Sequence, residues 1–213
     1  SLFIAHAARG SGYGKLLARA RYMFIAQRPE IIADHACAEL RGWRAPDGAQ
    51  PFWNAVGRHF FRMESVEADN YNAAHGNQFI EDMLPRYPIY MDLLPEDARE
   101  CLGRPHDNAR PAYKMLMEEG FVFNNYIDVF DGGPLVDAKV ANIRTVRDSR
   151  VVKVAAVADK EDGEDALLAT GAVESFRACK AKAKMSGDAM IIDRATAAAL
   201  KVETGSSVRW IKW

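Results

Sequence analysis

The segment with the clearest chemical potential is a glycine-rich turn at residues 9–14, which reads Arg-Gly-Ser-Gly-Tyr-Gly. Residues 2–7 before it predict a short buried strand, and residues 15–25 after it carry apolar side chains at helical spacing. Glycines let backbone N–H groups approach an anion, and a helix N-terminus adds partial positive charge. The turn therefore predicts a diphosphate site, with a tight strand-to-helix turn that binds no ligand as the alternative.

Two common nucleotide motifs do not fit this turn. Read as Gly10-x-Gly12-x-x-Lys15, it lacks the third glycine of a dinucleotide fingerprint, and no Walker-type Gly-Lys-Ser/Thr follows. The pattern Arg-x-x-Gly-x-Gly between a strand and a helix instead resembles the pyrophosphate loop of GCN5-related acyl-CoA transferases. Arg9, Gly12 and Gly14 fill that pattern, so the resemblance favours an acyl-CoA as the anion.

Histidine is the side chain that trades a proton near neutral pH without special tuning. His106 lies in a turn directly before a predicted helix, where loop residues are accessible to a substrate. Any one histidine is more often a surface or core residue than a catalyst. Position alone therefore makes His106 only the best of these candidates: His6, His35, His59, His75 and His106.

Carboxylates are the side chains that bind a guanidinium or an ammonium group, because they accept bidentate, charge-assisted hydrogen bonds. For each one alone, a solvated or helix-capping role is the more common explanation, and the sequence does not choose among them. The candidates are Glu39, Asp69, Asp92, Asp128 and Asp131.

The elements that must position these residues are mostly helices in the first two thirds of the chain. The firmest is a helix over residues 108–119, which we expect Asn108 to cap and Gly120 to end, with Met115 and Leu116 facing inward. Further strands are expected at 36–42, 121–123 and 126–130, and further helices at 51–61, 65–74, 77–84 and 97–102.

From about residue 135 the helical periodicity fades and short β-like runs take over. We therefore expect an α+β protein with two domains, residues 1–134 and a smaller β-rich subdomain, residues 135–213. The β-like runs are 139–146, 150–158, 166–171, 191–192 and 208–211, with a short helix at 194–200.

Composition excludes several classes of protein. The 213 residues are 49% apolar and 27% charged, with a net charge of −1 and no block of Lys and Arg, so nucleic acid is not an expected partner. Cys37, Cys101 and Cys179 lie far apart, without metal-ligand spacing, so no metal is expected. No apolar run approaches the roughly 18 residues that a membrane span needs, so we expect a cytoplasmic protein without membrane partners.

Many ordered blocks together resemble arginine N-succinyltransferases, over residues 2 to about 150 strongly and over the remainder more loosely. This number of blocks at consistent spacing is far more specific than the glycine turn alone. The most distinctive block is Asn-Tyr-Ile-Asp-Val-Phe-Asp-Gly-Gly-Pro at residues 125–134. Others are Leu2–Ile4, Arg9–Gly14, Arg21–Phe24, Ala38–Gly42, Pro51–Trp53, Phe60–Phe61, Phe79–Ile80, Pro88–Tyr90 and Glu119–Phe121.

The resemblance implies a GCN5-related acyl-CoA N-acyltransferase fold, a mixed sheet flanked by helices, for residues 1–134. It also implies transfer of succinyl from succinyl-CoA to the α-amino group of L-arginine. In this family a histidine before a helix is the proton donor and maps onto His106. Succinyl-CoA contacts map onto Leu2, Arg9, Gly10, Gly12 and Gly14.

The chain opens directly in the pattern of its first predicted strand, and family members carry further residues before that point. We therefore expect a core that is incomplete at its N-terminus and is completed by an N-terminal portion or a sister subunit. Two other functions stay open: a related acyltransferase acting on ornithine or another amine, and a non-catalytic subunit that keeps the fold alone.

Overall fold

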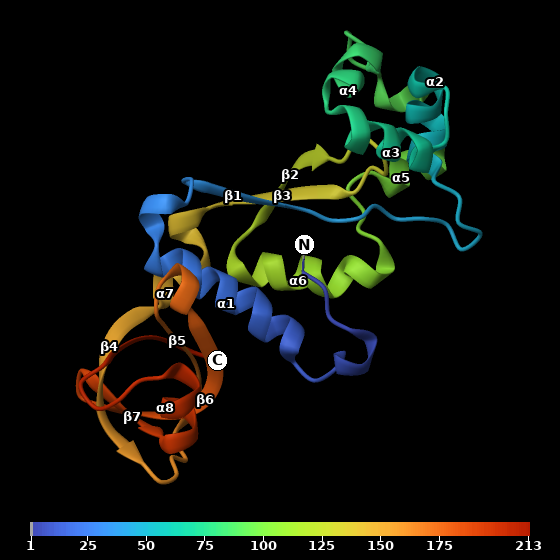
Figure 1. Cartoon of the computed structure of the whole chain (residues 1–213). Coiled ribbons are helices and arrows are strands. Elements are labelled where there is room, and N and C mark those ends of the chain that lie inside the picture. The colour runs from blue at the N-terminus through green and yellow to red at the C-terminus, as the bar shows by residue number, and fades with distance from the viewer. Residues whose placement is uncertain (1) are drawn as a thin grey trace. The chain divides into compact units, whose positions relative to one another are not determined.

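The computed structural model describes residues 2–213 and shows two compact units (Figure 1). The first unit comprises the residues up to His35 together with Lys139–Trp213, and the second comprises Ala36–Ala138. The first unit therefore joins segments from both ends of the chain, an arrangement that no sequence pattern indicated. The domain boundary expected at residues 134/135 stays a prediction.

The first unit is built on a closed barrel with the strand order β4-β7-β6-β5-β8. β4 pairs in parallel with β7, whereas the other neighbouring strands pair antiparallel. Val154, Leu168, Met190 and Ile192 are fully buried in its core. The strands are β4 (Arg150–Ala158), β5 (Glu164–Thr170), β6 (Arg177–Ser186), β7 (Ala189–Asp193) and β8 (Ser207–Lys212).

Strand β6 was not predicted from the sequence, although its exposed lysines alternate with less exposed residues. Lys180, Lys182 and Lys184 are exposed while Ala183 is buried. Alanine and lysine are both depleted in strands, so the segment carries little β-propensity of its own. Pairing with β5 and β7 decides its conformation, and Asp165 on β5 forms ion pairs with Lys180 and Lys182.

The helix predicted at residues 194–200 is confirmed as α8 (Arg194–Leu200). Its N-cap is Asp193, whose Oδ1 accepts a hydrogen bond from the Thr196 N–H at 2.7 Å. Hydrogen bonding from the Thr196 side chain, and then from its N–H, lowers the pKa of the Asp193 carboxyl. Ala197 and Leu200 face the barrel core, so the helix closes over the barrel interior.

The prediction of a β-like segment at residues 139–146 is wrong. The chain forms a 3-10 turn at Val140–Asn142 and then helix α7 (Arg144–Asp148). Val140, Ile143 and Val146 recur every three residues, which suits a helix rather than a strand. Ile143 is fully buried, and α7 packs beside α1 (Tyr13–Gln27), the helix that follows the glycine turn.

Helix α1 confirms the helix predicted after the glycine turn, and it packs on the barrel. Met23 of α1 is fully buried in a cluster with Leu167, Ala169 and Ile211. The guanidinium of Arg19 is also buried and donates to Thr145 Oγ1 at 3.2 Å and to the Lys212 carbonyl at 3.1 Å. A buried guanidinium needs such acceptors, because desolvation of an unpaired charge is costly.

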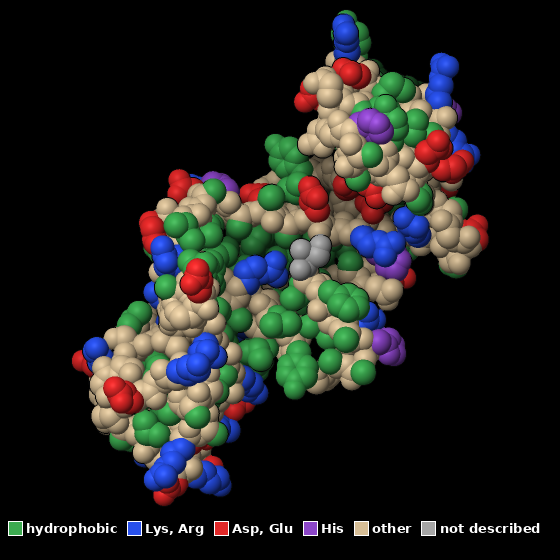
Figure 2. All heavy atoms as spheres, in the orientation of Figure 1, with side chains coloured by type: hydrophobic (Ala, Val, Ile, Leu, Met, Phe, Trp, Pro, Cys, Tyr) green, Lys and Arg blue, Asp and Glu red, His purple; other side chains and the backbone are tan. Residues whose placement is uncertain are grey.

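The strand predicted at residues 2–7 is also wrong. Residues 2–5 carry no strand pairing among residues 2–213, and His6–Ala8 form a 3-10 turn. An isolated extended segment is not a strand, because a strand requires a neighbouring ladder of hydrogen bonds. Instead of being buried, Phe3 is 76% exposed, and Figure 2 shows hydrophobic side chains gathered near the start of α1. The exposed members are Leu2, Phe3, Tyr13 and Leu17.

The second unit contains a sheet of order β1-β3-β2, formed by β1 (His35–Glu39), β2 (Val122–Ile127) and β3 (Pro134–Lys139). The two strands predicted at 121–123 and 126–130 are one strand, β2, with a bulge between Phe123 and Tyr126. Asn125 in the bulge has φ of +63°, a left-handed conformation that asparagine tolerates. The bulge explains why the pattern suggested two strands.

Short helices make up the remainder of the second unit, and the helices predicted at 51–61, 65–74, 77–84 and 97–102 are confirmed. Trp53 and Phe61 lie at the centre of an aromatic cluster, each 1% exposed and stacked with centroids 5.3 Å apart.

No helix among residues 2–213 is both long enough and apolar enough to cross a membrane. The helices are a π-helical segment Trp53–Gly57, α2 (Arg58–Phe61), α3 (Ser65–His75), α4 (Gln78–Met83), α5 (Glu96–Cys101) and α6 (Arg110–Glu119). Short 3-10 turns of this unit lie at Met91–Leu93 and Asp107–Ala109, and two in the first unit lie at Pro29–Ile31 and Val173–Ser175.

Candidate functional site

His106 lies in the second unit, immediately before the 3-10 turn Asp107–Ala109 that leads into α6. Its own backbone N–H donates to the Arg41 carbonyl at 2.7 Å, and its carbonyl accepts from the Ala109 N–H at 2.7 Å. Its ring nitrogen Nδ1 accepts from the Asn108 N–H at 3.1 Å. His106, partly buried, is thus fixed at backbone and side chain alike.

The prediction that Asn108 caps the helix is wrong, because the side chain that caps this turn is His106. A histidine fills this role because its Nδ1 lies as close to the backbone as the oxygen of an Asn side chain does. The predicted end of α6 is confirmed: Gly120 has φ of +97° and its N–H donates to the Met117 carbonyl. Met115 and Leu116 are partly buried.

Three chain segments meet at His106, and glycines make their close approach possible. Gly42 forms an isolated bridge with Pro105, and the Gly103 N–H donates to the Gly132 carbonyl at 2.8 Å. A Cβ at Gly42 would lie 2.1 Å from the Asp131 carbonyl oxygen, closer than any side chain can be accommodated. The exit of β1, the turn before His106 and the β2–β3 turn are therefore held together by their backbones.

The β2–β3 turn presents two of the predicted carboxylates at this junction. Asp128 Oδ1 accepts from the N–H groups of Phe130 and Asp131, at 2.8 and 3.1 Å, and Asp131 Oδ1 accepts from the Gly133 N–H at 2.9 Å. Burial raises the pKa of the Asp128 carboxyl, and the nearby carboxylates of Asp131 and Glu39 raise it further, against the two N–H donors. Both aspartates therefore shape the turn.

The other predicted carboxylates are not brought to this junction. Asp69 lies on α3, and Asp92 lies in the 3-10 turn Met91–Leu93 with Arg99 Nη1 3.7 Å from its Oδ1. No group of three or more His, Cys, Asp or Glu side chains suited to hold a metal occurs among residues 2–213. The structure thus brings together Glu39, Asp128 and Asp131 out of the five candidates.

Replacing Asp128 by asparagine should stabilise the protein increasingly as the pH rises. A raised pKa means that the folded state favours the protonated carboxyl of Asp128. The stability that this preference gives the wild type is fully present below the pKa of Asp128 in the unfolded chain, and it is lost as the pH rises through the pKa in the folded chain. The asparagine side chain would keep the oxygen acceptor without the charge. We expect the difference in melting temperature, variant minus wild type, to grow as the pH rises above about 4, the ordinary aspartate pKa. A difference that is constant with pH would contradict this account.

The glycine turn belongs to the first unit, and its geometry leaves backbone N–H groups available. Gly10 and Gly12 have φ of +83° and +84°, the left-handed region that favours glycine, and Gly12 is the N-cap of α1. The first helical bond runs from the Leu16 N–H to the Gly12 carbonyl, so the N–H groups of residues 13–15 have no helical partner. Arg9 Nε donates to the Ile4 carbonyl at 3.2 Å.

Gly14 differs from the other two glycines of the turn. A Cβ there would make only ordinary contact, 3.8 Å from the Ile4 side chain, so the described chain itself does not require glycine. The first turn of α1 carries no acidic residue. Open space, N–H groups without a helical partner and the helix N-terminus together suit an anion such as a diphosphate.

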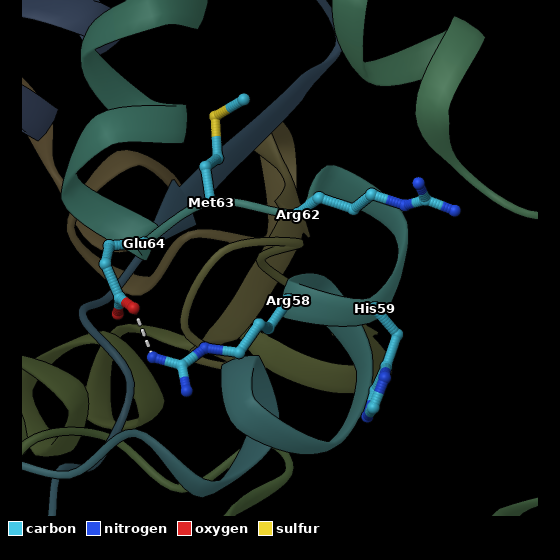
Figure 3. Close-up of a pocket in the computed structure, with 5 residues that line it drawn as sticks. All are labelled: Arg58, His59, Arg62, Met63 and Glu64. Atoms are coloured by element: carbon cyan, nitrogen blue, oxygen red, sulfur yellow. Dashed lines mark hydrogen bonds and ion pairs between the residues drawn. The ribbon is translucent and has the colours of Figure 1, made fainter.

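A surface pocket of about 580 Å³ lies elsewhere in the second unit and contains none of the predicted site residues (Figure 3). Figure 3 shows Arg58 and Glu64 pointing toward one another as an ion pair, while His59 and Arg62 point away from them. Met63 completes the lining. The pocket is therefore not the place where the predicted chemistry would occur.

The family of the chain follows from comparison with known proteins. The family model for the arginine N-succinyltransferase beta subunit matches residues 1–145, and the model for its C-terminal domain matches residues 150–212. The chain belongs to the arginine N-succinyltransferase family. The resemblance carried by residues 125–134 and the other sequence blocks is thereby confirmed.

Curated relatives give the extent of this likeness. Arginine N-succinyltransferase subunit beta of Pseudomonas aeruginosa is 39% identical over 210 residues, which are 98% of this chain and 62% of the relative. Subunit alpha of the same organism is 38% identical over 94% of this chain and 60% of its own length. An arginine N-succinyltransferase of Yersinia pestis is 34% identical, with 98% and 62% covered. The chain thus spans about three fifths of the length of these relatives.

Comparison with a solved structure confirms the α+β fold. The structure of arginine/ornithine succinyltransferase subunit AI from Pseudomonas aeruginosa matches with a TM-score of 0.83 and 36% identity. The match covers 99% of this chain and 60% of that one. Both units of this family member therefore share the architecture of that structure.

Sequence reasoning missed the features that hold the junction beside His106 together. The packing of Gly42 against Asp131 and the bond between Gly103 and Gly132 join segments far apart in the chain. The available signal was the run Asp131-Gly132-Gly133, in which two glycines follow a carboxylate. That run indicates close backbone packing, but it does not indicate the partner.

Proposed function

We propose that this chain transfers the succinyl group of succinyl-CoA to the α-amino group of L-arginine, giving N2-succinylarginine and CoA. The observation that carries the proposal is the family match, which extends over residues 1–145 and 150–212. The relatives named above are described as arginine N-succinyltransferases. The function proposed is therefore that of an acyltransferase in arginine catabolism.

The glycine turn is the proposed site for the diphosphate of succinyl-CoA, in a GCN5-related acyltransferase fold. The left-handed Gly10 and Gly12, with open space beside both, support this assignment, since they leave N–H groups accessible. Arg9 is exposed at the same turn and supplies positive charge. Leu2, 42% exposed, is the proposed contact for the acyl end of the molecule.

The proposed reaction is a direct attack of the neutral α-amine on the thioester carbonyl. The amine lone pair forms the C–N bond, and the electrons of the C–S bond leave with sulfur as CoA thiolate. His106 is the proposed catalytic residue, because its backbone and ring are fixed where three segments meet. A preorganised group of this kind lowers the barrier without reorganisation. No step requires a metal.

Ornithine is the second candidate for the amine substrate. The solved relative is named an arginine/ornithine succinyltransferase, and ornithine carries the same α-amino and carboxylate groups as arginine. The two differ only at the end of the side chain. Discrimination would depend on which carboxylate receives a guanidinium, for which planar bidentate geometry is favourable.

We also propose that the chain works together with a further polypeptide segment or a sister subunit of the same family. Two relatives that match this chain almost end to end are named subunits alpha and beta. The exposed hydrophobic residues near the start of α1 are consistent with such a partner, because exposed apolar patches favour association.

The test is arginine-dependent release of CoA thiol from succinyl-CoA, measured with the chain alone and with its family partner. We expect release that requires arginine, falls sharply when acetyl-CoA replaces succinyl-CoA, and persists to a lesser degree with ornithine. Binding of CoA without turnover under all these conditions would overturn the enzymatic proposal in favour of a non-catalytic subunit.

A further inference from the structure

Arg104 lies two residues before His106, in the extended segment that leads toward α6. This segment pairs with the chain that leaves β1 in an isolated antiparallel bridge. On one side of the bridge, the Trp43 N–H donates to the Arg104 carbonyl at 2.9 Å. On the other side, the His106 N–H donates to the Arg41 carbonyl at 2.7 Å. The register therefore sets Trp43 opposite Arg104 and Arg41 opposite His106.

These four side chains share one face of the bridge. Successive residues of an extended chain point to opposite sides, so the neighbours of Gly42 and of Pro105 point the same way. The β2–β3 turn occupies the other face, because a Cβ at Gly42 would lie 2.1 Å from the Asp131 carbonyl oxygen. The face turned away from that turn carries the proposed catalytic histidine, two guanidinium groups and an indole: Arg41, Trp43, Arg104 and His106.

The guanidinium of Arg104 is held over the ring of Trp43. Its Cζ lies 4.2 Å from the ring centroid, a cation–π contact, and both residues are partly buried. Among residues 2–213, this guanidinium has no carboxylate at ion-pair distance and no hydrogen-bond acceptor. The ring contacts the planar group over its face, so the N–H donors at its edges stay free, in a fork that matches a carboxylate.

The charged groups beside Arg104 do not neutralise it. Asp107, next to His106, forms an ion pair with Arg110 at 2.9 Å, and Arg41 is a second, exposed cation on the same face. A partly buried cation without a counter-ion carries a desolvation cost, which an anionic ligand would offset. This face is therefore suited to an anion, and the planar fork of Arg104 favours a carboxylate.

We propose that Arg104 binds a carboxylate of the substrates beside the reacting groups, and that Trp43 positions its guanidinium. The inference rests on the proposed succinyl transfer, in which His106 is the catalytic residue. Each substrate carries a carboxylate only a few bonds from the C–N bond that forms. One is the α-carboxylate of arginine, and the other is the far end of the succinyl group. Arg104 is thus a specificity-determining residue, which disfavours a substrate that lacks the carboxylate.

Substrates that differ only in one carboxylate test this proposal kinetically. Butyryl-CoA has a methyl group in place of the succinyl carboxylate, and L-argininamide has a neutral amide in place of the α-carboxylate. Arg104→Gln should lower kcat/KM for succinyl-CoA with L-arginine roughly 10- to 100-fold, because a charge-assisted hydrogen bond is lost. The same variant should match the wild type with the analogue that lacks the bound carboxylate.

The analogue that escapes the loss identifies the carboxylate. If butyryl-CoA escapes, Arg104 binds the succinyl end, and if L-argininamide escapes, Arg104 binds the α-carboxylate. An equal loss with every substrate would mean that Arg104 only supports the fold, and the proposal would then be wrong.

Two further variants serve as controls. Arg104→Lys keeps a cation over Trp43 and so preserves stability, but it should recover only part of the activity, because a point charge replaces the planar fork. Arg99→Gln changes an arginine of α5 that lies 3.7 Å from Asp92, and it should leave every rate unchanged.

A binding measurement addresses the same question without enzymatic activity. In nitrogen-15 spectra of the full chain with labelled arginine, the Nε–H signal that is missing in Arg104→Lys belongs to Arg104. We expect this signal to shift with unlabelled succinate or with unlabelled L-arginine, whichever carries the recognised carboxylate. Chloride at the same ionic strength should not move it. A signal that moves with neither compound, or equally with chloride, would overturn the proposal.

The outcomes keep this inference distinct from the proposed function. If the chain releases no CoA with any pair of substrates, succinyl transfer fails, and the spectra still decide whether Arg104 binds a carboxylate. If the enzyme is active and Arg104→Gln matches the wild type with all substrates, the function stands and the assignment of Arg104 fails.

Discussion

Replacing His106 by alanine should lower kcat at least about ten-fold while the protein stays folded, since a positioned proton-handling or donor group contributes roughly 10²–10⁴-fold. The loss should fall mainly on kcat, because the group acts on charge that develops in the transition state. Alanine also removes the ring acceptor for Asn108, so a loss of about 1 kcal/mol of stability is expected as well. Steady-state kinetics with succinyl-CoA and arginine measure the first effect, and thermal unfolding measures the second.

Two matched variants define the controls for this experiment. His59→Ala removes an exposed histidine of the same unit and should leave kcat unchanged. Arg9→Ala at the glycine turn should raise the KM for succinyl-CoA and leave kcat nearly intact, because it removes uniform binding of the diphosphate. Near-normal kcat for His106→Ala would remove His106 from the mechanism.

Replacing Trp53 by alanine should destabilise the second unit by about 3–5 kcal/mol, the usual cost of removing a large buried aromatic side chain. The indole is 1% exposed, stacks on Phe61 with centroids 5.3 Å apart, and lies 5.9 Å from the ring of Phe130. Its Nε1–H also donates to the Met63 carbonyl at 3.1 Å. The substitution therefore leaves a cavity and an unsatisfied carbonyl together.

The effect of Trp53→Ala should extend to the candidate site. Phe130 belongs to the β2–β3 turn that carries Asp128 and Asp131, so loosening the aromatic cluster should also loosen that turn. Amide hydrogen exchange measures this locally, which matters because a chain with two compact units need not unfold in one step. We expect faster exchange in peptides covering 51–84 and 128–133.

Trp53→Phe is the control for this prediction, because it keeps an aromatic ring and loses only the larger volume and the indole N–H. Its cost should be well below that of alanine. Equal protection of the 128–133 peptides in the wild type and the alanine variant would show that Phe130 does not couple the cluster to the turn.

Elements with strong local signals were predictable from the sequence. The helix at 194–200 has an aspartate N-cap and alanine-rich composition, and Gly120 in a left-handed conformation ends α6 where the pattern placed the stop. The barrel strands β4 and β8 are rich in valine and other β-formers. Local propensity and turn chemistry decide such elements, so a single sequence suffices.

The errors share a physical cause, which is that a strand depends on its neighbours. Residues 2–5 have an apolar, strand-like pattern but no pairing among residues 2–213, whereas β6 has an unpromising Ala/Lys pattern but neighbours on both sides. The sequence of a segment alone does not decide whether it forms a strand, because the strands that it pairs with lie far along the chain.

The sequence by itself determined the family, and it predicted an anion site at the turn of residues 9–14 and His106 as the best of five histidines. These conclusions follow from residue types and short spacings, which can be read without knowledge of the fold. Only the tertiary structure decided that Gly42, Gly103 and Gly132 join three distant segments and that the Asn108 N–H donates to Nδ1 of His106. Contacts between distant backbones and the direction of a ring depend on packing, and packing is a property of the whole unit.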